Sequence, residues 1–201
     1  NKNNLSKRLD AAEKQAKPRI PKIVHQFWFG KIGMPDLFKQ WQREFQEKHP
    51  GWLFINWNED RVKEKFPSGL VNEKIYDEAR MMYDYATMSK VLRYEVLNKY
   101  GGLYMDPDIR CFEDFLPLHN AYDFYCGFGH FDTYGAINNG IFASVKGHPI
   151  LKACIDHIKS CETPPDGDGF FDWTAKNLGH QTFTKCVYEN LDKGSNVDIV
   201  F

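Results

Sequence analysis

Two carboxylates separated by a single residue, Asp106 and Asp108, are the side chains in this sequence best suited to chemistry. Their hard oxygen ligands suit Mg²⁺ or Mn²⁺, ions that keep several waters and complete their shell with substrate phosphates. A metal held there would neutralise the charge that grows as the bond to a diphosphate leaving group breaks. We expect both carboxylates to point the same way from an extended backbone, with Pro107 stiffening the turn between them.

The elements around this pair strengthen the interpretation, because an Asp-x-Asp alone usually marks a solvated turn. Residues 84–100 predict a helix, since Tyr85, Met88, Leu92 and Val96 recur at steps of three and four. Two glycines end that helix, and a short strand at residues 103–105 then leads directly into Asp106. The carboxylates are therefore expected at the end of a strand.

The N-terminal half predicts a β-α-β unit. An apolar, β-rich run at residues 20–30 predicts a buried first strand, and residues 36–48 predict a helix with an apolar stripe. Residues 52–57 then predict a second strand. Such a unit predicts parallel strands in an open α/β sheet, with a ligand near their C-terminal ends.

The remaining chain gives weaker signals. We expect a surface helix or linker at residues 1–19, a strand at 140–144, a helix at 149–159, a flexible loop at 163–169 and a strand from 198 onward. No apolar run reaches the roughly 20 residues of a membrane span. Because the chain lacks an initial Met and stops within an apparent strand, we expect a longer parent protein that could carry an anchor.

Composition excludes several classes of protein. A length of 201 residues with 42% hydrophobic residues fits one α/β domain. The formal net charge of -1 gives no overall attraction to nucleic acid or to an anionic membrane. The five cysteines contain no Cys-x-x-Cys pair, so we expect reduced thiols and no zinc site. The sequence also lacks a Gly-x-Ser-x-Gly elbow and a P-loop lysine, which disfavours hydrolases and NTPases.

Taken together, these residues resemble the glycosyltransferases of family 32, which are related to the toxin glucosyltransferases. The central match is Tyr-Gly-Gly-Leu-Tyr-Met-Asp-Pro-Asp at residues 100–108; further matches in the same order are residues 20–30, 89–94, Asn139, 147–149 and 179–184. The resemblance implies a GT-A fold, a Rossmann-like mixed and mostly parallel sheet flanked by helices. It also implies use of a nucleotide sugar with retention of anomeric configuration.

The resemblance assigns a role to each matching residue. It implies that Asp108 ligates the metal directly and that Asp106, also at the metal, contacts the ribose and a metal-bound water. Arg93 would contact the diphosphate or the donor sugar, with a surface ion pair as the alternative. The remaining residues expected to bind the nucleotide sugar are Gln26, Phe27, Trp28, Ser89 and Asn139.

Two of these assignments have alternatives in the residues themselves. Trp28 would stack on the base at the end of the first strand, although a core tryptophan fits the same position. Asn138 could take the part of Asn139, or both could build a turn.

One residue departs from the family pattern. The family usually has an acidic residue after the Ser of the Ser-x-x-Leu-Arg stretch, where it holds hydroxyls of the donor sugar, whereas this chain has Lys90. Either the donor sugar differs, or Asp84 reaches the site from an earlier turn of the helix. The family's C-terminal segment that closes on the diphosphate is also absent, so residues 20–201 are expected to form a truncated catalytic domain.

The sequence therefore predicts a Mn²⁺- or Mg²⁺-dependent hexosyltransferase that uses a nucleotide-diphosphate sugar, with a UDP-sugar favoured over GDP-mannose. Its acceptor would be a glycan, as in polysaccharide biosynthesis, a lipid or a protein, contacted through loops near residues 125–137 and 163–173. A cytoplasmic location is favoured, with the lumen of the secretory pathway as the alternative. The competing readings are a non-catalytic module that binds carbohydrate or nucleotide sugar, and a phosphatase, which the mid-chain position of the carboxylates disfavours.

Overall fold

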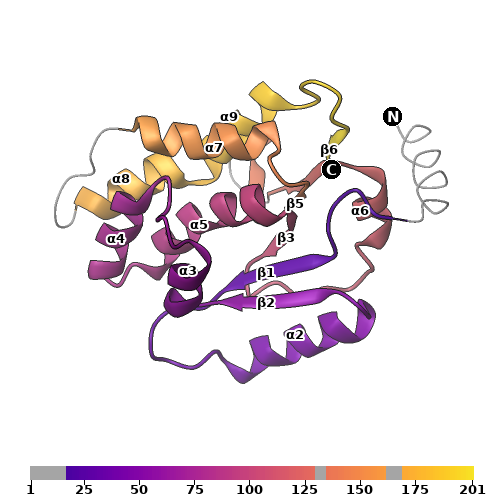
Figure 1. Ribbon diagram of the computed structural model, residues 1–201, viewed down its shortest axis with the longest axis horizontal. Helices are drawn as coiled ribbons and strands as arrows, with labels where there is room; N and C mark the ends of the chain where they lie inside the picture. Colours follow the sequence, from indigo (N-terminus) through magenta and orange to yellow (C-terminus); the bar gives the residue numbers. More distant parts are fainter. Residues whose placement is uncertain (1–16, 130–134, 162–168) are drawn as a thin grey trace.

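A six-stranded sheet forms the centre of the protein, flanked by helices on both faces (Figure 1). The computed structural model describes residues 17–129, 135–161 and 169–201. The strand order is β2-β1-β3-β5-β4-β6. The bounds of the strands are β1 Ile23–Phe27, β2 Leu53–Trp57, β3 Gly102–Met105, β4 Phe124–Phe128, β5 Ile137–Ser144 and β6 Asp198–Val200.

The sheet is mixed and mostly parallel, as predicted. Strand β1 pairs in parallel with β2 and with β3, and β4 pairs in parallel with β6. Strand β5 runs antiparallel to both of its neighbours, β3 and β4. The α/β class expected from the sequence is confirmed, and the ends of β1 and β3 meet at one edge.

The predicted β-α-β unit is confirmed, with helix α2 at Asp36–Lys48 between β1 and β2. Strand β1 is shorter than the expected run of residues 20–30. At the start of this run, the amide of Ile20 donates to the carbonyl oxygen of His119 over 3.1 Å. Ile20 therefore lies outside β1. At the far end of the run Gly30 adopts a positive φ of 81°, which ends the extended backbone.

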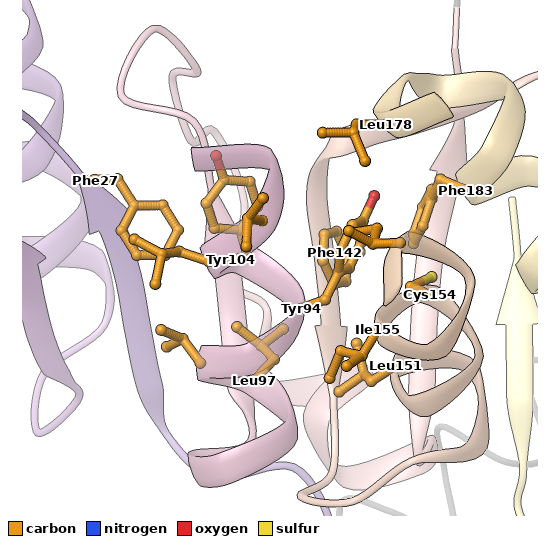
Figure 2. Close-up of a cluster of buried hydrophobic side chains, with 14 of the residues drawn as sticks. Phe27, Tyr94, Leu97, Tyr104, Phe142, Leu151, Cys154, Ile155, Leu178 and Phe183 are labelled. Atoms are coloured by element: carbon orange, nitrogen blue, oxygen red, sulfur yellow. The ribbon is translucent and has the colours of Figure 1, made fainter. Parts of the chain in front are cut away.

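Helix α5, Tyr85–Tyr100, is the central helix of the core. Figure 2 shows Leu97 and Tyr94 of this helix between side chains of the sheet, such as Tyr104, and side chains of helix α7, such as Leu151. Helices α4 (Glu73–Met81), α7 (Pro149–Ser160), α8 (Gly169–Leu178) and α9 (His180–Asn190) complete this layer. The sequence predicted one apolar stripe, but neighbours on several sides leave α5 buried almost all round.

The opposite face of the sheet is covered by α2 and by the short helix α6, Leu116–Ala121. Phe45 of α2 is fully buried there against side chains that alternate along the strands, such as Val24 and Leu103. Because successive side chains of a strand point to opposite faces, Tyr104 faces α5 while its neighbours Leu103 and Met105 face α2. Asp106 continues this alternation toward the α5 side.

A two-glycine turn joins α5 to β3. Gly101 and Gly102 have φ angles of 68° and 108°, and a Cβ atom on Gly102 would lie 2.5 Å from the carbonyl oxygen of Ile23. His25 fixes this turn from the neighbouring strand: its Nε2 lies 2.9 Å from the Gly101 carbonyl oxygen. The Trp57 indole donates to His25 Nδ1 over 3.0 Å, which assigns the proton to Nε2. The turn sets where β3, and hence Asp106, begins.

Several other expectations can be compared with the structure. The strands near 140–144 and after 198 and the helix at 149–159 are confirmed. All five cysteines are free, and all but Cys161 are buried. Helix α3 (Glu59–Lys65), α4, α6, α8, α9 and strand β4 were not predicted. The first expected acceptor loop, residues 125–137, starts inside β4. In the second expected acceptor loop, residues 163–173, the part from residue 169 onward belongs to helix α8. Residues 1–16, 130–134 and 162–168 lie outside the described residues. Among the described helices, none is both long and apolar enough to cross a bilayer.

Candidate nucleotide-sugar site

A pocket of about 300 Å³ opens at the edge of the sheet where β1 and β3 end. Its lining combines aromatic rings with two carboxylates and a hydroxyl: Phe27, Trp28, Phe29, Phe38, Tyr85, Ala86, Ser89, Asp106, Pro107 and Asp108. The pocket brings together five of the residues singled out from the sequence, namely Phe27, Trp28, Ser89, Asp106 and Asp108. It lies at the strand ends where a β-α-β unit predicts a ligand.

The two carboxylates occupy a tight turn and not the extended backbone that we expected. The amide of Ile109 donates to the Asp106 carbonyl oxygen over 3.1 Å, which closes a four-residue turn. Asp in the first position and Pro in the second are favourable for such a turn. The turn still directs both carboxylates to the pocket, so the spacing has the expected result through a different backbone geometry.

Asp106 is held from several directions. Its amide donates to the Gly140 carbonyl oxygen over 2.7 Å, and its own carbonyl oxygen accepts from Gln26 Nε2 at 3.4 Å. The Tyr104 hydroxyl donates to its carboxylate. Burial raises the pKa of Tyr104 well above its ordinary value, so this hydroxyl keeps its proton. Asp106 is therefore a carboxylate of fixed orientation.

Asp108 differs from Asp106 because it is exposed. Within the described residues no cation lies in ion-pair distance of its carboxylate, whereas Asp106 lies 3.7 Å from an Arg93 nitrogen. The pair therefore consists of one held and one available carboxylate.

Arg93 lies behind Asp106 and does not line the pocket. Its side chain is only 6% exposed, its Nε donates to the Ser89 carbonyl oxygen over 3.2 Å, and a terminal nitrogen donates to the Asn139 carbonyl oxygen. The guanidinium carbon also sits 4.5 Å from the centre of the Tyr104 ring. Burial lowers its pKa, but Tyr104 and Asp106 raise it more, so Arg93 is a buried cation that orients Asp106.

Gln26 and Asn139 also stand outside the pocket lining. Gln26 is buried and its side-chain oxygen accepts from Gln42 over 2.8 Å, so its contact with the site is the Asp106 backbone. The Asn139 side chain lies near the hydroxyl of Tyr94 on α5: burial raises the pKa of Tyr94, and Asn139 lowers it in part. Asn138 instead accepts from the Gly140 amide over 2.7 Å. Both asparagines lie inside strand β5, so the turn that we considered as an alternative does not form.

The aromatic part of the pocket comes mainly from Trp28 and Phe38. Trp28 is half-buried, its indole nitrogen donates to the Ile32 carbonyl oxygen over 2.8 Å, and its ring meets Phe38 edge to face at 6.2 Å between centroids. Because Trp28 lines the pocket and is only partly buried, its ring is placed where a planar ligand can reach it. Phe27, in contrast, is 4% exposed and packs mainly on Tyr104.

Some residues that line the pocket or lie beside it were not singled out by the sequence. Tyr85 and Ala86 lie near the start of α5, beside Ser89, whose hydroxyl donates to the Tyr85 carbonyl oxygen over 2.9 Å. Tyr104 could have been found, since it lies two residues before Asp106 and so on the same face of the strand. Gly140 could not, because it comes from β5; a Cβ atom there would lie 2.6 Å from Asp106 Oδ2.

The described residues fit a metal ion only as an incomplete site. Within residues 17–129, 135–161 and 169–201, no group of three or more His, Cys, Asp or Glu side chains could hold a metal. The protein ligands available for a metal ion in the pocket are the carboxylates of Asp106 and Asp108. This set fits Mg²⁺ or Mn²⁺, which bind through one or two carboxylates plus water and substrate phosphate oxygens.

Comparison with known proteins supports this interpretation of the pocket. Residues 35–125 match the glycosyltransferase sugar-binding region containing the DXD motif. Inositol phosphoceramide mannosyltransferase 3 of Schizosaccharomyces pombe is 30% identical over 144 residues, which are 69% of this chain and 37% of that protein. Mannosyl phosphorylinositol ceramide synthase SUR1 of Saccharomyces cerevisiae is 26% identical over 144 residues, 70% of this chain and 35% of that protein. The chain thus spans little more than a third of these relatives.

Among solved structures, that of PaToxG Glycosyltransferase superposes with a TM-score of 0.69 at 18% sequence identity. The superposition covers 92% of this chain and 75% of that one. The fold is therefore that of a GT-A-like glycosyltransferase, as predicted.

Proposed function

The chain belongs to the family of glycosyltransferases whose sugar-binding region contains the DXD motif, and we propose that it transfers a hexose from a nucleotide-diphosphate sugar. The observation that carries this proposal is the lining of the pocket, which combines two aromatic rings, Trp28 and Phe38, with two carboxylates, Asp106 and Asp108. An aromatic wall suits a base, and a carboxylate pair suits a metal-bridged diphosphate.

We assign the two carboxylates different parts in this reaction. Asp108, exposed and without a cation in ion-pair distance among the described residues, is the proposed metal ligand. Asp106, held by Tyr104 and Arg93, is the proposed partner of the ribose and of metal-bound water. A bound Mn²⁺ or Mg²⁺ would neutralise the charge that develops on the leaving diphosphate.

Arg93 acts in this proposal through Asp106. Its contacts with Ser89, Asn139 and Tyr104 leave the guanidinium buried behind the carboxylate, and this arrangement supports a positioning role. A direct contact between Arg93 and the diphosphate stays a prediction, as do contacts of Ser89 and Asn139 with the donor. For Gln26, the hydrogen bond to the Asp106 carbonyl oxygen supports a positioning role as well.

The donor that we favoured from the sequence differs from the donor that the relatives' names suggest. We favoured a UDP-sugar, whereas the relatives' names specify mannosyl transfer and inositol phosphoceramide. These names favour a mannosyl donor such as GDP-mannose and an acceptor with a lipid-linked inositol phosphate. Retention of configuration is part of the proposal, and the anomeric proton signal of the product would test it.

The test is substrate turnover with a variant that keeps the pocket shape. UDP-glucose and GDP-mannose, each with and without Mn²⁺, are supplied to the wild-type chain and to Asp108→Asn, and release of nucleoside diphosphate is measured. We expect release only with metal and a loss of at least about a hundredfold in the variant. The matched control is Asp156→Asn on α7, away from the pocket. Unchanged activity of Asp108→Asn, or full activity in excess chelator, would refute the proposal.

A non-catalytic sugar-binding module is the competing function, because aromatics and a metal site can hold a sugar without reacting. The same experiment separates the two. Binding of a nucleotide sugar by calorimetry, with no transfer of its hexose to an acceptor or to water and hence no release of nucleoside diphosphate, would favour the binding module.

A further inference from the structure

We propose that Lys90 recognises an anionic group of the donor, adding a cationic contact to the substrate pocket. This inference rests on the proposed function and deepens it, because it names the chemistry that the donor must present. The family resemblance gives Lys90 no such role. The argument comes from the position of Lys90 on α5, its burial and the charges around it.

Lys90 is not among the residues that line the pocket, but its position on α5 places it next to two residues that do. Ala86 and Ser89, which precede it by four and by one residue, both line the pocket. Residues four apart lie one above the other on a helix, with Cβ atoms about 5–6 Å apart. Lys90 therefore lies one helical turn beyond Ala86 at the margin of the pocket, three residues before Arg93.

Among the described residues, no counter-ion lies close to the charge of Lys90. Lys90 is half-buried, and within the described part of the chain no carboxylate oxygen lies within 4.0 Å of its ammonium nitrogen. Arg93, by contrast, has Asp106 beside it. Burial lowers the pKa of Lys90, Asp84 raises it and Arg93 lowers it further, so the protein itself supplies little to offset the cost of burying this cation.

An anionic ligand would supply that missing partner. Partial burial of an ammonium group is costly unless an anion pairs with it, and a lysine is an effective point charge for phosphate. The diphosphate of a nucleotide sugar is one source of such an oxygen, and the carboxylate of an acidic donor sugar is the other. Both lie on the donor, and the experiment must distinguish them.

The experiment measures binding, so it does not depend on knowing the acceptor. Calorimetric titrations with Mn²⁺ use UMP, UDP, UDP-glucose and UDP-glucuronate, and the matching GMP, GDP and GDP-mannose, on wild type and Lys90→Gln. We expect Lys90→Gln to weaken binding of the diphosphates about tenfold or more, as loss of a charge-assisted hydrogen bond should. Binding of the monophosphates should change less. The slope of affinity against salt concentration should also become shallower.

Two further variants make the result interpretable. Lys90→Arg keeps the charge and should stay within about threefold of wild type. Lys152→Gln makes the same change at an exposed residue of α7 and should have no effect. Thermal unfolding of each variant shows whether the fold is retained. A loss confined to UDP-glucuronate would place the anion on the sugar, whereas an equal loss for all diphosphates would place it on the diphosphate.

The outcomes separate this inference from the function on which it rests. If the wild-type chain binds no nucleotide or nucleotide sugar, the proposed function fails and the role of Lys90 fails with it. If wild type binds and Lys90→Gln binds every ligand equally well, with the same salt dependence, then Lys90 is structural and the inference alone is wrong.

Discussion

Protonation of His25 should destabilise the fold in a defined range of pH. Burial lowers the pKa of His25 from 6.5 to about 4, although its hydrogen bond to Gly101 raises it in part. Below pH 6.5 the unfolded chain therefore binds a proton that the folded protein resists until about pH 4. Stability from this residue is fully present above pH 6.5 and is lost as the pH falls to 4. At about 1.4 kcal/mol per pH unit, the loss is about 3 kcal/mol.

The assay compares urea unfolding of wild type and His25→Gln at several pH values between 7.5 and 4. Glutamine can accept from Trp57 and donate to Gly101 but cannot titrate, so only the pH dependence of its stability should differ. We expect the curve of the variant to be flatter by about 3 kcal/mol over this range. His119, whose pKa burial lowers to about 3, titrates in both proteins and cancels in the difference. Parallel curves for the two proteins would refute the reasoning.

Two further substitutions test the pocket. Trp28→Ala should weaken nucleotide binding by about 1–3 kcal/mol if its ring stacks on the base; calorimetry measures this, and unchanged binding with lowered stability would return Trp28 to a core role. Gly140→Ala would put a Cβ atom 2.6 Å from Asp106 Oδ2, so turnover should fall about tenfold to a hundredfold as that carboxylate shifts. Its control is Gly127→Ala on β4, where the nearest atom, the Phe201 carbonyl oxygen, is 3.4 Å away; equal initial rates for the two alanine variants would contradict the prediction.

The central elements could be predicted because their signals are local. The α5 helix, its two glycines and the strand before Asp106 follow each other along the chain, so periodicity and turn chemistry place them. The helix α3 has little such signal: it spans seven residues and depends on the side chain of Asn58, which accepts from the Arg61 amide over 2.9 Å. Short helices of this kind are decided by tertiary packing more than by propensity.

The parts of the site that could not be predicted depend on contacts between distant segments. The sequence placed Arg93 on the correct helix. Its burial behind Asp106 depends on β5, where the Asn139 carbonyl oxygen accepts a hydrogen bond from the guanidinium. Strand β4 was not predicted because apolar and polar residues do not alternate clearly along it. Its extended backbone depends on pairing with β5 and β6. Sequence reasoning thus found the residue types of the site, and packing decided which of them face the pocket.

The reversed direction of β5 has a consequence for how this protein could change over evolution. Because β5 runs against β3 and β4, its first residue Ile137 and the last residue of β4, Phe128, pair with each other at the same sheet edge as Asp106. The connection between them can therefore lengthen or shorten without moving the register that pairs Met105 with Ile141. Under the proposed function, the length of this connection could therefore vary during evolution while the geometry of Asp106 and Asp108 is inherited intact.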